Sequence, residues 1–391
     1  MSTSDIDGLL QGAVDNGVLP GVVALTGDHD GAQYEGAFGL LNIDGNDVVA
    51  PDTMFAIMSM TKAFVSVAAL QLVEQGTIEL SQPVAEVLPA FADLAVLEGF
   101  DDDIPRLRAP ARQATIRNLL THTSGLAYSF LNADILRYRQ LTGTPDEISG
   151  QRAMLNVPLI ADPGTRWEYG ISTDWLGQLV EAASGTDLES YCRDRIFDPL
   201  GMTDATFRPN DEQAARMMTL YDRSPDGGLV QNSLEIPEPE FWMGGSGAFA
   251  TGTDYLRFIR ALLRGGELDG ERVLRSETVE LAFSDQLDGL ALPEVMISVI
   301  PELTNEVPAL PFAEGFGLGF HLFLEDIPGM RRSGAGNWAG LFNCYFWIDR
   351  TSGVAGALLT QVLPFFDAQI VGTAAGFELG VYEHLGALQS A

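Results

Sequence analysis

Hydrophobic positions follow two different patterns along this chain, and the two patterns occupy different regions. Short apolar runs bounded by Gly and Asp turns fill the first fifty residues and return after residue 314. Runs of this length with turn residues on both sides are typical of strands. We expect strands at 21–27, 33–40, 315–324, 342–349 and 354–362. The turn at 28–31 predicts a hairpin between the first two.

Helical character dominates the middle of the chain. Residues from about 80 to 240 are rich in helices and loops and show no run of strands. We expect helices at 61–75, 173–184, 254–264 and about 368–388. The first of these is followed by Gly76, a residue that commonly ends a helix.

Strands at both ends and helices between them predict an α+β fold in which both termini build one antiparallel sheet. We expect an α/β lobe from residues 1–80 and 265–391, with helices flanking the sheet, and a mainly helical lobe from residues 81–264. Sites for small molecules often lie in the cleft between two such lobes. The Pro- and Leu-rich stretch 287–311 has no steady period and predicts a loop that partly covers something.

Charge narrows the range of partners. The 391 residues carry a formal net charge of −32, which repels phosphate and argues against nucleic acid and anionic membranes as partners. No window has the roughly 18 to 20 apolar residues of a membrane span, and the beginning of the chain does not resemble a signal peptide. The sequence therefore predicts a cytoplasmic location, and it predicts nothing about the oligomeric state.

Cysteine and histidine suggest no metal site and no disulfide framework. The two cysteines, Cys192 and Cys344, are far apart and are expected to be buried thiols. The four histidines form no HxH or HxxxH pair. His122 is expected to be structural, and Ser246 is expected to lie in a glycine-rich turn, because no lysine follows it with P-loop spacing. No metal or other cofactor is predicted.

Lysine is almost absent from the chain. Lys62 is the only lysine among 22 basic residues, so it is expected where arginine cannot serve. A desolvated lysine can lose its proton and act as a base, whereas arginine keeps its charge. Ser59 stands three residues earlier, where the predicted helix begins, so the hydroxyl and the amine share one face. This pair predicts an activated serine nucleophile; the simpler interpretation is a surface lysine on a core helix.

Several ordered motifs resemble the serine beta-lactamases and penicillin-binding proteins, and among them the class C-like esterases called family VIII carboxylesterases. Ser59-Met-Thr-Lys62 matches the S-x-x-K motif of that family. Tyr169, in the segment WEYGISTDWLG, matches its catalytic tyrosine. Further similar segments are LLTHTSGL at 119–126, GGSG at 244–247 and GFGLGF at 315–320. The resemblance implies a beta-lactamase-like fold and a catalytic set of Ser59, Lys62 and Tyr169.

Two departures separate this chain from the lactamases. In place of their K-T-G it has Trp338-Ala-Gly340, which resembles the W-x-G of the esterase branch. That resemblance implies that Trp338 and Gly340 contact substrate, and that the backbone N–H groups of Leu341 and Ser59 form the oxyanion hole. Ile171 stands where lactamases have a substrate-binding asparagine, which implies a more apolar cleft.

Arg331 and Arg332 precede this motif. They could restore a contact to a substrate carboxylate, but we expect them to be surface charges at the end of a strand.

The function expected from these residues is hydrolysis of small to medium acyl esters through an acyl-enzyme on Ser59. The same Ser–Lys–Tyr site could instead serve an acyltransferase, an amidase or peptidase, or a weak beta-lactamase. A catalytically silent binding protein is the remaining class. No serine lies in a G-x-S-x-G motif, so the usual α/β-hydrolase plan is absent. The expected partner is a small-molecule ester.

Overall fold

A seven-stranded antiparallel sheet forms one half of the computed structural model, which describes residues 2–232 and 238–389. The strands lie in the order β13 (Glu314–Phe316), β14 (His321–Phe323), β15 (Gly336–Gly340), β16 (Cys344–Asp349), β17 (Val354–Leu359), β1 (Gly21–Asp28) and β2 (Ala32–Gly39). Strand β1 pairs directly with β17, Val23 opposite Leu359. The two ends of the chain therefore build one sheet, as the sequence predicted.

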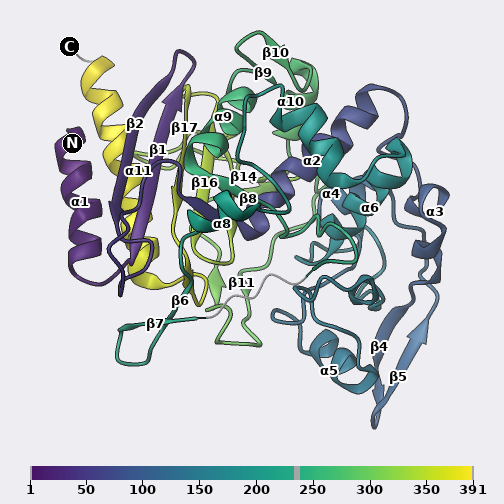
Figure 1. The fold of residues 1–391 in the computed structure, drawn as a ribbon. Helices are drawn as coiled ribbons and strands as arrows, with labels where there is room; N and C mark the ends of the chain where they lie inside the picture. Colours follow the sequence, from purple (N-terminus) through teal and green to yellow (C-terminus); the bar gives the residue numbers. More distant parts are fainter. Residues whose placement is uncertain (1, 233–237, 390–391) are drawn as a thin grey trace.

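Helices cover both faces of this sheet. Alternate residues of β1 point to opposite faces, as in any strand. Val22 and Ala24 pack with α1 (Thr3–Asp15) and α11 (Ala368–Gln389), which lie side by side in Figure 1. Val23 and Leu25 belong to the larger core on the other face, with α9 (Gly252–Leu263). Because both faces are covered, β1 is buried along nearly its whole length.

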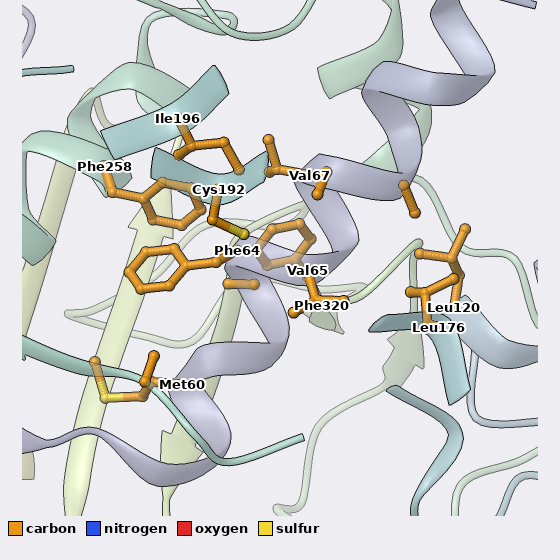
Figure 2. Close-up of a cluster of buried hydrophobic side chains, with 14 of the residues drawn as sticks. Met60, Phe64, Val65, Val67, Leu120, Leu176, Cys192, Ile196, Phe258 and Phe320 are labelled. Atoms are coloured by element: carbon orange, nitrogen blue, oxygen red, sulfur yellow. The ribbon is translucent and has the colours of Figure 1, made fainter. Parts of the chain in front are cut away.

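The remaining helices lie mostly on the other side of the molecule, around the central helix α2 (Thr61–Glu74) (Figure 1). They are α3 (Val84–Val87), α4 (Ile116–Leu120), α5 (Ala133–Thr142), α6 (Ser172–Ser184), α7 (Leu188–Cys192), α8 (Asp211–Ala215) and α10 (Ser276–Ala282). Of these, α6 and α7 pack on α2. Every residue of α2 from Thr61 to Leu72 is buried. Figure 2 shows Phe64, Val65 and Val67 of this helix packed among side chains from several other elements. A helix that is surrounded by other elements is expected to carry apolar residues on all of its faces, because no face meets water.

Short strand pairs complete the fold. They are β3 (Met54–Ala56) with β8 (Phe249–Thr251), β4 (Val96–Asp101) with β5 (Ile104–Arg108), β9 (Glu267–Leu268) with β10 (Glu271–Arg272), β11 (Val295–Met296) with β12 (Val307–Pro308), and β6 (Tyr221–Arg223) between β7 (Leu229–Gln231) and β18 (Val362–Leu363).

The structure corrects three expectations about these elements. The β4–β5 hairpin lies inside the region where no run of strands was expected, and it projects from the molecule in Figure 1. The single strand expected at 315–324 is two strands, because the chain turns at Gly319, whose φ is +96°. Helix α9, expected in the helical lobe that ends at residue 264, packs on the sheet instead.

The expectation for the two cysteines is confirmed. Cys192 and Cys344 are buried free thiols. No helix among the described residues has both the length and the apolarity needed to cross a membrane.

Candidate active site

Ser59 lies on a tight turn between a strand and the central helix. Strand β3 ends at Ala56, and a short 3₁₀ helix, Met58–Met60, leads directly into α2. Met58 has a φ of +46°, a left-handed backbone conformation that residues other than glycine rarely adopt. Backbone strain of this kind persists where the surrounding structure holds the residue in place. Here the strained residue directly precedes the half-buried Ser59.

Lys62 lies in the first turn of α2 with only 2% of its surface exposed. Its Nζ lies within hydrogen-bonding distance of Ser59 Oγ at 3.0 Å, the Tyr128 hydroxyl at 2.9 Å and the Gly245 carbonyl at 2.7 Å. The structure therefore brings together the serine and the lysine of the predicted pair. It excludes the simpler interpretation of Lys62 as a surface residue.

Two tyrosines approach Lys62, and sequence analysis named only one of them. Tyr169 presents its ring, with the centroid 4.9 Å from Nζ, and its hydroxyl accepts from Trp338 Nε1 at 3.3 Å. Tyr128 presents its hydroxyl directly. Burial holds the pKa of Tyr128 well above its ordinary value, so this hydroxyl keeps its proton. Its position two residues after the LLTHTSGL segment was the available signal.

The loops that carry the two tyrosines are bound to each other. The Tyr128 amide donates to the Tyr169 carbonyl at 3.2 Å, and the rings meet edge to face with centroids 5.0 Å apart. A side chain at Gly170 would clash with the backbone of Leu126 and Ala127. Glycine at this position therefore allows the close approach that sets the geometry of both tyrosines.

A buried ion pair supports the Tyr128 loop. Glu147 accepts from the amide of Ser129 at 2.6 Å and from its hydroxyl at 2.8 Å. Arg139 of α5 pairs with the same carboxylate at 3.2 Å, and both side chains are almost fully buried. A buried charge requires such a partner, because its transfer from water is costly. The position of Tyr128 therefore depends on this pair.

Strand β15 closes another side of the site. A side chain at Gly340 would clash with the Ile57 carbonyl, so this glycine allows β15 to pack against the turn that carries Ser59. This gives the glycine a physical role different from the substrate contact expected from the sequence. Trp338 is half-buried against Tyr169, and Leu341 is partly exposed directly after the strand.

Other residues singled out in the sequence lie elsewhere. Ile171 is fully buried in the main core, and it does not line the large cavity near the site that is described below. Arg331 is largely buried and pairs with Glu378 at 2.6 Å, which corrects its expected place on the surface. Arg332 pairs with Asp326 and is exposed.

His122 packs edge-on against Tyr169, with ring centroids 5.1 Å apart. Burial, reinforced by the charge of Lys62, holds the pKa of His122 well below its ordinary value, so its ring stays neutral.

A largely apolar cavity of about 660 Å³ opens beside the turn that carries Ser59, although Ser59 is not among the residues that line it. Its wall includes Met58, which precedes Ser59 in the chain, together with Ser246, Gly247 and Leu341. The more distant wall is largely apolar and includes Phe207, Trp242, Phe249, Leu303 and Leu363. A cavity of this size and composition suits a drug-sized apolar molecule.

The segment 287–311 packs over the tyrosine side of the site, as the sequence predicted. Leu290, Leu292 and Met296 lie against a cluster that contains Tyr169 and Trp338. The Val299 amide donates to the Phe130 carbonyl at 2.9 Å. This segment therefore covers one side of Tyr169 and Trp338.

Within the described parts of the chain, no group of three or more His, Cys, Asp or Glu side chains is arranged to hold a metal ion. The chemistry that this site offers is that of a hydroxyl, an amine and two phenols.

A serine and a lysine at the beginning of a buried central helix, beside strand β15 and two tyrosines, are typical of enzymes that act through an acylated serine. The comparisons agree: the Beta-lactamase family model matches residues 6–375, and the chain belongs to that family. It is a serine hydrolase-type enzyme of the acyl-transfer and ester-hydrolysis class.

Curated relatives span nearly the whole chain. Monacolin J acid methylbutanoyltransferase of Aspergillus terreus is 34% identical, over 95% of this chain and 93% of its own. Lovastatin esterase of Penicillium rubens is 33% identical, over 92% and 93%. Among solved structures, the LovD6 variant of simvastatin synthase from Aspergillus terreus superposes with a TM-score of 0.86 at 30% identity, over 98% and 97% of the two chains.

Proposed function

We propose that this protein is an acyltransferase that moves an acyl group through Ser59 onto the hydroxyl of a bulky, largely apolar acceptor. The observation that carries this proposal is the largely apolar cavity of about 660 Å³ whose wall includes Met58, the residue before Ser59. Water as the acceptor would need no such cavity, whereas an apolar alcohol gains affinity by burying its surface there. The relative named as a methylbutanoyltransferase supports the same choice.

In the proposed reaction, the Ser59 proton passes to neutral Lys62 Nζ as the serine oxygen bonds to the acyl carbon of the donor. The amides of Ser59 and Leu341 hold the oxyanion. Tyr169, which is partly exposed, protonates the leaving group, while the buried Tyr128 orients the Lys62 amine. The acceptor hydroxyl then attacks the acyl-enzyme and gives its proton to the Tyr169 oxygen, while Lys62 returns its extra proton to the Ser59 oxygen as the new ester leaves, which restores all three groups.

Ester hydrolysis, the function expected from the sequence, is the second candidate. The relative named as lovastatin esterase favours it. The two candidates differ only in whether water or an alcohol attacks the acyl-enzyme, so a product assay separates them.

The test uses purified protein with p-nitrophenyl butyrate as donor and a series of mono- and polycyclic alcohols as acceptors. Mass spectrometry measures new ester against free butyrate. We expect ester to exceed acid with the bulky alcohols, nitrocefin to remain uncleaved, and Ser59→Ala to abolish both products. Acid as the sole product with every acceptor would favour the esterase, and full activity in Ser59→Ala would refute the site.

A further inference from the structure

We infer that Asp174 is a positioning residue for Lys62, and that its carboxylate stabilises the ammonium ion formed when Lys62 takes the Ser59 proton. The inference rests on the proposed acyl transfer at Ser59 and adds to it a buried countercharge. Asp174 lies in the first turn of α6 and is 2% exposed.

The backbone of one residue connects Asp174 to Lys62. Asp174 Oδ1 accepts from the Gly245 amide at 2.9 Å. The carbonyl of the same residue accepts from Lys62 Nζ at 2.7 Å. The Asp174 carboxylate therefore fixes the backbone of Gly245 by a hydrogen bond, and the Gly245 carbonyl in turn accepts a hydrogen bond from the Lys62 amine.

The second carboxylate oxygen also lies near the reacting groups. A Cβ atom added to Gly245 would clash with Asp174 Oδ2 and would lie 2.9 Å from the Tyr128 hydroxyl. Glycine is therefore the residue that allows α6, the 244–247 turn and Tyr128 to meet at one point. This contact places negative charge beside the Lys62–Tyr128 pair.

The buried charges around this point divide into two pairs. Lys62 approaches from α2, and Tyr128 from its loop. Arg139 and Glu147, from α5 and the segment after it, pair with each other at 3.2 Å. Asp174 is then the carboxylate that complements Lys62. Burial raises the pKa of Asp174 to about 6, against the opposing effect of Lys62, so the carboxylate is ionised at neutral pH and above.

Charge develops on Lys62 during the reaction. As the Ser59 oxygen bonds to the acyl carbon, the serine O–H bond breaks, the proton moves to Nζ, and the carbonyl electron pair moves to the oxyanion. A fixed carboxylate near the new ammonium ion favours this transition state more than the ground state, in which the amine is neutral. The aspartate of a Ser–His–Asp triad stabilises its imidazolium in the same way.

The test compares wild type with Asp174→Asn, which keeps an oxygen acceptor for the Gly245 amide but removes the charge. The readout is the rate at which a fluorophosphonate probe labels Ser59 from pH 5 to 10. Labelling forms the serine O–P bond, expels fluoride and moves the serine proton to Lys62. We expect the maximal rate to fall about tenfold and the acid side of the pH profile to change, because the wild-type rate falls as Asp174 gains a proton near pH 6 and asparagine does not titrate.

The matched control is Asp254→Asn. Asp254 is an equally buried aspartate that accepts from the amides of Asp204 and Ala205 and has no bond to the site. Its labelling profile is expected to match wild type. A slower Asp174→Asn with an unmoved profile would refute the inference and leave the proposed function intact. Failure of wild type to be labelled or to turn over esters would overturn both. If Asp174→Asn does not fold, the test uses Asp174→Ser instead, because this variant removes the same charge.

Discussion

At the scale of single residues, the two tyrosines near Lys62 differ in burial and in contacts. Tyr128 is 4% exposed and its hydroxyl lies 2.9 Å from Lys62 Nζ, whereas Tyr169 is partly exposed and its hydroxyl contacts Trp338. A buried hydroxyl can orient the amine, but a hydroxyl facing the cleft is needed to protonate a leaving alcohol. The two residues should therefore have separable effects.

The first prediction separates them by leaving group. Tyr169→Phe should lower kcat/KM for ethyl butyrate about 100-fold but affect p-nitrophenyl butyrate much less, because p-nitrophenolate leaves without a proton. Tyr128→Phe should lower both rates by a similar factor. Tyr34→Phe, which loses a hydroxyl bonded to Asp7 on the far face of the sheet, is the control. Equal losses for both esters in Tyr169→Phe would contradict its role as proton donor.

The second prediction concerns the pH dependence of stability. Burial raises the pKa of Asp254 to about 6, from an ordinary value of 3.8. The folded state then binds more protons than the unfolded state between about pH 4 and 6, so this group's contribution to stability is lost as pH rises through that window.

Asp254→Asn does not titrate. Its free energy of unfolding should therefore rise relative to wild type by up to roughly 3 kcal/mol between pH 4 and 6.5, and stay constant above. Urea unfolding at several pH values measures this difference. A difference that does not change with pH would show that Asp254 titrates alike in both states.

At the scale of elements, the site depends on loops that are fixed by buried polar contacts. The third prediction is that Glu147→Gln lowers the free energy of unfolding by about 3–5 kcal/mol, because it leaves the Arg139 charge buried without its partner. Glu98→Gln removes one partner of an exposed pair with Arg108 and should cost less than about 1 kcal/mol. Chemical denaturation compares the two variants. Equal small losses would mean that water reaches Arg139.

The fourth prediction tests the cavity through helix α8. Ala214 and the neighbouring Ala215 are both exposed, but only Ala214 lines the cavity. Ala214→Phe should reduce transfer to bulky alcohols at least tenfold while hydrolysis of p-nitrophenyl acetate persists. Ala215→Phe should behave as wild type in both assays. Equal transfer rates in the two variants would mean that the acceptor binds elsewhere.

At the scale of the whole molecule, the net charge of −32 opposes compaction through self-repulsion. Salt screens such repulsion, with a Debye length that falls from about 10 Å at 0.1 M to about 3 Å at 1 M. The fifth prediction is that Tm rises between 0.05 and 1 M NaCl. Sucrose at matched osmolarity is the control, and an equal rise in sucrose would exclude a charge effect.

Much of the architecture could be predicted from local patterns. The strands of both termini, helix α2 and the Ser59–Lys62 spacing are encoded by short-range periodicity, and helical geometry alone places a hydroxyl and an amine three residues apart on one face. The β4–β5 hairpin could not be predicted in this way, because its two strands are short, largely exposed and lack a strong apolar pattern.

What the sequence by itself determined is thus the fold family, the serine–lysine pair and a sheet built from both termini, because each leaves a local pattern or an ordered motif. Only the tertiary structure decided that Tyr128 contacts Lys62, that Gly340 packs against Ile57 and that Asp174 reaches the site through Gly245. These contacts join residues far apart in the chain. They depend on how loops and helices pack, and no periodicity in the sequence records that packing.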